Sequence, residues 1–156
     1  NFAGGGLDCI HGMLTHDITA SGLADGGAHM RMICDASMPS FQLSFWGRDR
    51  TRGPKFSLEY LVGKLTLKNA RLYGLDDRGQ IAVGKRADIN VIDFDRLSVQ
   101  MPYVMHDLPK GSPRLLQGST GYLATICGGI ITRRNDAETG ARPGRLIRSA
   151  PQRMAR

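Results

Sequence analysis

Asp25 is the residue whose type and surroundings are best suited to chemistry. It lies in the segment Gly22–His29 (GLADGGAH), directly before Gly26 and Gly27 and four residues before His29. A carboxylate can take a proton from an attacking water molecule and pass it to a leaving group, and glycines let another molecule approach the backbone closely. An Asp-Gly pair more often closes a turn, so local spacing alone leaves both interpretations open.

The other residues with metal-binding or nucleophilic side chains do not cluster in the sequence. The four histidines form neither His-x-His nor His-x-x-x-His, the spacings typical of zinc ligands. We interpret His11 as a packing or surface residue and His106 as a side chain that orders its loop by hydrogen bonding. Cys34 precedes Asp35 without a suitably placed histidine and is expected to be a buried structural cysteine.

The three cysteines and the N-terminal segment indicate the cellular compartment of the protein. An odd number of cysteines without metal-type spacing argues against a disulfide framework and fits a reducing environment. The segment Asn1–Gly6 shows no basic and apolar targeting pattern. A cytoplasmic location is therefore expected.

Two helices and a strand are expected to position Asp25. Apolar residues recur at helical spacing over Leu7–Leu14, and a second apolar helical stripe begins after the cap Ser57 and ends at Gly74. Between them, Ala20–Ala24 is predicted to be a strand that carries Asp25 at its carboxyl end, where the active sites of α/β folds gather. A loop is expected to connect this strand to the second helix.

After Gly74 the pattern changes to short strands. Ala87–Phe94 is rich in β-branched residues, and two further strands, Tyr122–Cys127 and Ile130–Thr132, flank the two-residue loop Gly128-Gly129. The intervening segment Met101–Gly118 contains three prolines and is predicted to be an ordered but irregular connection.

Six short segments spread over the chain become recognisable in combination. In order they are GLADGGAH (22–29), MICDAS (32–37), LYGLDDRG (72–79), ADINVID (87–93), HDLP (106–109) and TGARPGR (139–145). Together they resemble the C-terminal part of the N-acyl-D-amino-acid deacylases, the D-aminoacylase-like branch of the amidohydrolase superfamily. Each motif alone is weak evidence for this family. The occurrence of all six in the family's order, along nearly the whole chain, makes the resemblance specific.

The resemblance implies an α/β fold built from two incomplete parts. Residues 1–75 would be the C-terminal end of a (β/α)₈ amidohydrolase barrel, and residues 76–156 part of a small β-sandwich domain with a basic tail. A complete barrel takes about 250 residues. The chain is therefore expected to be a fragment of a longer enzyme.

The resemblance also implies an activity: hydrolysis of linear amide C–N bonds other than peptide bonds, in N-acyl-D-amino acids. Water would be activated by zinc or a similar divalent metal, with Asp25 as metal-site carboxylate and as general base and then acid. Gly26, Gly27 and His29 would contact the small-molecule substrate. The family's His-x-His and its other metal ligands have no counterpart here, so the fragment alone is expected to be inactive.

The charge of the chain suggests an alternative, a non-catalytic basic module that binds an anionic partner such as RNA or anionic lipid. The formal net charge is +7, from 21 basic and 14 acidic residues, and part of the excess lies after Glu138. No aromatic residues interleave the basic ones in the tail and no nucleic-acid motif is recognised. No apolar run approaches the roughly 20 residues that cross a bilayer. Neither a nucleic-acid nor a membrane partner is therefore expected, and the sequence leaves the oligomeric state open.

Overall fold

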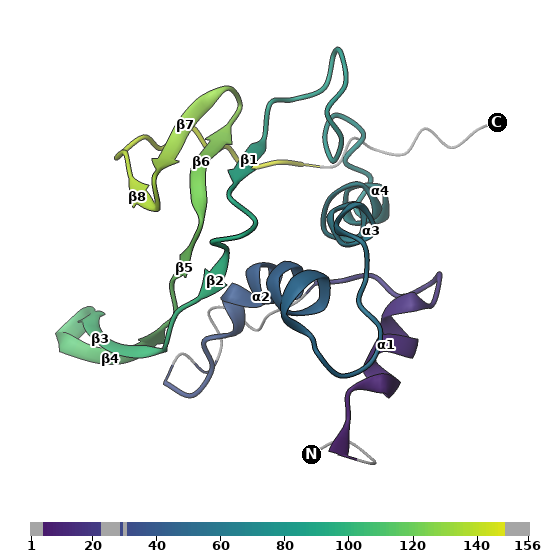
Figure 1. The fold of residues 1–156 in the computed structure, drawn as a ribbon. Helices are drawn as coiled ribbons and strands as arrows, with labels where there is room; N and C mark the ends of the chain where they lie inside the picture. The colour runs from purple at the N-terminus through teal and green to yellow at the C-terminus, as the bar shows by residue number, and fades with distance from the viewer. Residues whose placement is uncertain (1–4, 23–28, 30, 149–156) are drawn as a thin grey trace.

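The computed structural model describes residues 5–22, 29 and 31–148. Within these residues the longer helices precede the strands along the chain (Figure 1). The helical elements of this first part are α1 (Asp8–Thr15), a 3₁₀ turn (Asp35–Ser37), α2 (Met38–Ser44) with a π-helical turn (Phe45–Asp49), α3 (Leu58–Gly63) with a second π-helical turn (Lys64–Lys68), and α4 (Asn69–Leu72). The expected mixture of helices and sheet is confirmed. Among the helices in these ranges, none is long and apolar enough to cross a membrane.

The strands of the described residues pair in antiparallel fashion. The largest sheet has the order β1-β6-β7-β8 and consists of β1 (Ile89–Ile92), β6 (Tyr122–Cys127), β7 (Ile130–Arg134) and β8 (Ala137–Glu138). Two smaller ladders pair β2 (Ser98–Val99) with β5 (Ser119–Thr120), and β3 (Tyr103–Leu108) with β4 (Ser112–Leu116). The β3–β4 hairpin projects away from the helices beyond the β2–β5 ladder (Figure 1).

Helices and turns that a capping residue or a glycine marks in the sequence form at the predicted positions. The Ser57 hydroxyl accepts a hydrogen bond from the Tyr60 amide at 3.2 Å and starts α3. Gly74, with φ of +66°, ends α4 in a Schellman motif, in which the Leu75 amide donates to the Ala70 carbonyl at 2.8 Å. The predicted first helix, the strand at β1 and the hairpin turn at Gly128-Gly129 are confirmed as well.

The predicted loop between residues 25 and 57 is wrong, because it contains α2 and its π-helical turn. The buried residues of α2 are Ser40, Gln42, Leu43 and Ser44. Three of these four side chains are polar, so the buried side of the helix carries no apolar stripe. The helical period is therefore hidden in the sequence.

The predicted irregular connection over Met101–Gly118 is also wrong, because most of it forms the β3–β4 hairpin. Its prolines occupy positions that a hairpin tolerates: Pro109 begins the 3₁₀ turn between the strands, and Pro113 lies where the register shifts. The His106 ring nitrogen Nδ1 lies 3.1 Å from the Gly111 carbonyl oxygen. This contact confirms the predicted role of His106 in ordering the segment.

The strand predicted over Ala20–Ala24 is wrong for its described part, since Ala20, Ser21 and Gly22 belong to no strand. Its last two residues lie outside the described residues. A barrel strand would need a parallel neighbour, and every strand pair in the described ranges is antiparallel.

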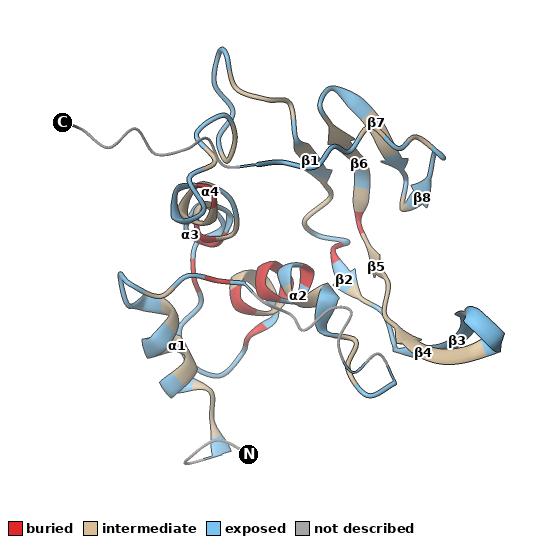
Figure 2. Cartoon of the chain, turned by 180° about the vertical axis from the view of Figure 1, so that it is seen from behind, coloured by how far each residue is buried: buried red, intermediate tan, exposed pale blue. Residues whose placement is uncertain are grey.

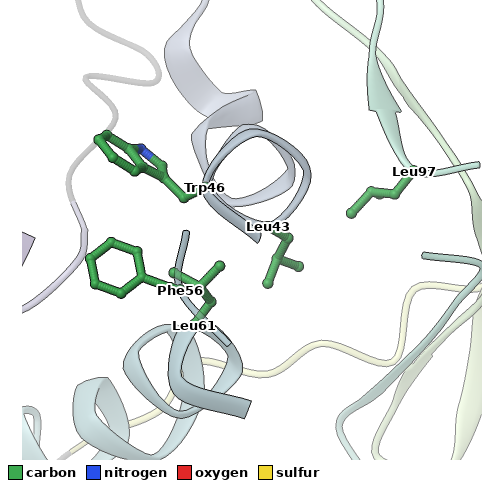
Figure 3. Packing of buried hydrophobic residues seen from close by; sticks show 5 residues of the cluster. All are labelled: Leu43, Trp46, Phe56, Leu61 and Leu97. Atoms are coloured by element: carbon green, nitrogen blue, oxygen red, sulfur yellow. The ribbon is translucent and has the colours of Figure 1, made fainter. Parts of the chain in front are cut away.

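The hydrophobic core lies among the helices and reaches the strand part through the buried Leu97 and the half-buried Ile92, Phe94 and Tyr122. Its fully buried members are Leu61 on α3 and Leu97 just before β2, and between them lies Leu43 of α2 (Figure 3). On the far side of α2, Trp46 packs near Phe56 with ring centroids 5.9 Å apart. By contrast, every strand residue is half-buried or exposed, as Figure 2 shows.

His11 of α1 belongs to the edge of this core. Its ring stacks on Phe56 with centroids 4.2 Å apart and an interplanar angle of 7°. The stacking confirms the packing role predicted for this histidine.

Arg48, at the end of the α2 segment, connects the helices to the strands. Its guanidinium donates to the carbonyl oxygens of Phe94, of Asp95 at 3.0 Å and of Leu97 at 2.6 Å. It also lies over the Phe94 ring, 5.5 Å from the centroid. One side chain thereby fixes the turn between β1 and β2 against the helices.

Replacing Arg48 with methionine is expected to lower the free energy of unfolding by about 1–3 kcal/mol, because three carbonyl groups lose their charged donor. Urea unfolding measures the change. Arg71→Met, at an exposed position, is the matched control and should change little. Equal urea midpoints for Arg48→Met and the parent would show that the hydrogen bonds of Arg48 do not stabilise the fold.

Asp88 connects the start of β1 to the β6–β7 turn. Its carboxylate accepts hydrogen bonds from the Gly128 amide at 2.7 Å, from Arg86 Nε at 2.9 Å and from Arg78 at 3.0 Å. Burial opposes ionisation, but the Gly128 amide and the two arginines outweigh it and hold the pKa of Asp88 below 3.8.

Asp88→Asn is expected to lower the free energy of unfolding by about 1–2 kcal/mol at neutral pH. Because the folded-state pKa is depressed, the stabilisation is present above the unfolded pKa and is lost as pH falls through the folded value. Urea unfolding at about pH 7 and about pH 3 should therefore show the two proteins converging in acid. A stability difference that stays constant with pH would show that ionised Asp88 does not contribute.

Candidate functional site

The structure places only one of the four predicted site residues. Asp25, Gly26 and Gly27 lie outside the described residues. His29 is exposed and has φ of +51°, in the left-handed region. Its carbonyl oxygen accepts hydrogen bonds from the amides of Met32 at 2.7 Å and Ile33 at 3.0 Å, so its backbone forms a tight turn. Whether its side chain contacts substrate stays a prediction.

The segment that precedes Asp25 borders a cavity of about 710 Å³. Ser21 and Gly22 line it together with residues of α2, of the α3–α4 segment and of the stretch from Gly79 to Ile92. The volume falls in the range of small-molecule sites, about 300–1,000 Å³. Apolar side chains such as Leu43 and Leu65 share the wall with the polar Asn69 and Tyr122.

Ser21 is held through both of its oxygen atoms. Gln42 Nε2 of α2 donates to the Ser21 hydroxyl at 2.9 Å, and Asn69 Nδ2 of α4 donates to the Ser21 carbonyl at 2.6 Å. Ser21 is 7% exposed and Gln42 is 4% exposed. Two helices separated in sequence therefore fix the position of one residue between them.

Lys64 holds the same segment a few residues earlier. Its ammonium group donates to the carbonyl oxygens of Leu14 and Thr19, each at 2.8 Å. The Leu14 carbonyl belongs to the last turn of α1, where the helix dipole favours a cation. Burial lowers the pKa of Lys64 below 10.5, and nearby Lys68 lowers it further.

The sequence analysis did not select Lys64 and Asn69 as functional candidates, although their spacing in the helix gave a signal. Lys64 follows Leu61 by three residues and Asn69 follows Leu65 by four, so both lie on the apolar stripe of their helix. A polar residue on a buried helical face is expected to have a specific partner. Gln42 gave no comparable signal, because its helix was not recognised.

The described side chains do not form a metal site by themselves. Within the ranges that the structure covers, no three His, Cys, Asp or Glu residues lie close enough together to hold a metal ion. Cys34, expected to be buried, is half-buried. Cys127 is also half-buried, and Arg86 donates to its sulfur at 3.7 Å.

The start of the basic tail is engaged in local pairing. Arg142 lies 2.8 Å from Glu138, and Arg133 of β7 lies 3.4 Å from the same carboxylate. Two of the arginines that an anion-binding surface would need are therefore paired with a carboxylate.

Comparisons with known proteins agree with the resemblance seen in the six segments. The chain matches the group described as "Amidohydrolase family" over residues 6–133. It is 32% identical over 102 residues to an N-acyl-D-glutamate deacylase of Alcaligenes xylosoxydans xylosoxydans, an alignment that covers 65% of this chain and 19% of that protein. No solved structure matches the chain significantly. Since the family match spans most of its length, the chain belongs to the amidohydrolase family.

Proposed function

We propose that this chain is the C-terminal part of an enzyme that removes the acyl group from N-acyl-D-amino acids. The observation that carries the proposal is the family match over residues 6–133. The 32% identity to a protein named N-acyl-D-glutamate deacylase narrows the substrate class to small N-acylated amino acids. The order of the six segments points in the same direction.

In the proposed architecture, residues 1–75 are the end of a catalytic barrel and residues 76–156 belong to a β-sandwich. The change from helices to antiparallel strands near residue 75 supports this division. So does the exposure of the larger sheet, in which Val91 and Ile130 remain 43% and 51% exposed. A sheet with exposed apolar residues is what one layer of a sandwich presents without its partner layer.

The reaction that we propose is attack of water on the carbonyl carbon of the amide. Asp25 takes a proton from the attacking water as the new C–O bond forms, and returns it to the nitrogen as the C–N bond breaks. The products are a carboxylic acid and a free amino acid, so no oxidant or reductant is consumed. Gly26, Gly27 and His29 would lie against the substrate.

A divalent metal such as zinc would polarise the amide carbonyl and acidify the attacking water. The described side chains offer no three-ligand cluster. Asp25 would thus be this chain's contribution to the metal site, and the other ligands would come from outside the described residues.

The test is Asp25→Asn in the longer protein, with N-acetyl-D-glutamate as substrate and release of free D-glutamate as the readout. The amide side chain cannot accept a proton, so kcat is expected to fall about 100-fold or more. Asp95→Asn, at an exposed position, should retain the parent's kcat. If Asp25→Asn stayed within a few-fold of the parent, the assigned role would be wrong.

A further inference from the structure

The cavity of about 710 Å³ continues onto an apolar surface that is open to the outside. The α3–α4 segment and β1 stand on opposite sides of the cavity, and α2 lies below them (Figure 2). Val62, Leu65 and Ile81 belong to its lining, and Val62 is 41% and Ile81 88% exposed. Val83, close to Ile81 in the chain, is fully exposed. We call these four side chains the open apolar surface.

The loop that carries Ile81 is held in place at its base, although its tip is exposed. Arg78 forms an ion pair with Asp88 at 3.0 Å, which ties the two ends of the loop together. At Gly79, with φ of +90°, a Cβ would lie 2.7 Å from the Ala70 Cβ, so the loop begins tightly against α4. An apolar side chain stabilises a protein only when it is removed from water. A fixed loop with an apolar tip is therefore suited to contact another surface.

The cavity also contains a buried acceptor for a hydrogen bond. Asn69 lines the cavity, and its Nδ2 donates to the Ser21 carbonyl at 2.6 Å. Its Oδ1 is buried and accepts no hydrogen bond within the part of the chain that the structure describes. A buried amide oxygen without a donor is unfavourable. The occupant of the cavity is therefore expected to supply an N–H or O–H group.

The comparison with the deacylase indicates what this occupant is. The alignment covers 19% of that protein, so most of such an enzyme lies outside this chain. We propose that the cavity and the open apolar surface dock a polypeptide segment from the remainder of the longer enzyme, and that a donor of this segment binds Asn69 Oδ1. The inference rests on the part of the proposed function that makes this chain a piece of a longer enzyme.

A polypeptide segment fits this surface better than a small molecule or a second copy of the chain. Its backbone carries an N–H group at every residue except proline, and its side chains can cover Leu65 and Ile81 together. A small molecule inside the cavity would leave Val83 exposed, because Val83 is not part of the lining. In a two-fold contact between copies the same surface faces itself, and one hollow surface does not fill another.

The first test measures whether Ile81 is covered in the longer protein. A cysteine is placed there as Ile81→Cys, and Arg71→Cys is the matched control. Arg71 is also exposed and follows Asn69 by two residues, which places it on the other side of the helix. If a docked segment covers Ile81, a maleimide should modify Ile81→Cys at least about 10-fold more slowly than Arg71→Cys. Equal rates in the folded protein would overturn the proposal.

Two details make this comparison specific. Mass spectrometry of the labelled peptides distinguishes the introduced cysteine from Cys9, Cys34 and Cys127. In concentrated urea the two introduced cysteines should react at the same rate, because unfolding removes the cover. A difference that persisted in urea would mean that the local sequence slows the reaction, and the proposal would be overturned.

The second test identifies the occupant by photo-crosslinking. The photoreactive residue p-benzoylphenylalanine replaces Ile81 or Arg71 in the longer protein, and the linked peptides are sequenced by mass spectrometry after irradiation. We expect the probe at position 81 to link, within one polypeptide, to a peptide outside residues 1–156. The probe at position 71 should form no such link. Links confined to residues 1–156, or links that join two copies, would overturn the proposal.

These outcomes are independent of the catalytic test with Asp25→Asn. If Asp25→Asn loses activity while Ile81→Cys reacts as fast as Arg71→Cys, the docking role is overturned and the proposed function stands. If Asp25→Asn retains activity while the probe at position 81 links to the remainder of the longer protein, the proposed chemistry fails and the docking role stands.

Discussion

The packing of α2 between the other helices and the strands is the interaction on which the rest of the structure depends. Leu43 and Trp46 contribute to the buried core, and the core reaches the strand part through Leu97. Burial of a leucine side chain is worth about 1.5–3 kcal/mol, and the strands contribute no fully buried residue of their own. Gly47 permits the close approach, since a Cβ there would lie 3.2 Å from Leu61 Cδ1 and 3.3 Å from the Phe94 ring.

The same helices supply both the apolar side chains of the core and polar side chains that bind backbone groups. Their apolar side chains form the core, while Gln42, Lys64 and Asn69 donate hydrogen bonds to Thr19 and Ser21. Apolar packing is nondirectional and tolerates small displacements, whereas hydrogen bonds to one serine and to two carbonyl groups define a position. The buried polar side chains thus add defined positions to a region whose stability comes from apolar packing.

The sequence predicts what is determined locally and misses what depends on tertiary contacts. Ser57, Gly74 and Gly128 mark their helix ends and hairpin turn because each meets a requirement of its own backbone. The α2 helix escaped prediction because Gln42 is buried by a partner 21 residues away, which no local pattern shows. The segment around Asp25 was selected from its residue types, whereas the contact of Gln42 with Ser21 could be seen only in the folded chain.

The most direct measurement is a crystal structure of the longer protein grown with zinc, with anomalous diffraction used to locate the metal. The account predicts a zinc ion about 2.0–2.2 Å from an Asp25 carboxylate oxygen, with Ser21 still bound by Gln42 and Asn69. A zinc ion held entirely by other residues, with the Asp25 carboxylate beyond hydrogen-bond distance of its ligands, would contradict the assignment of this chain to the catalytic site.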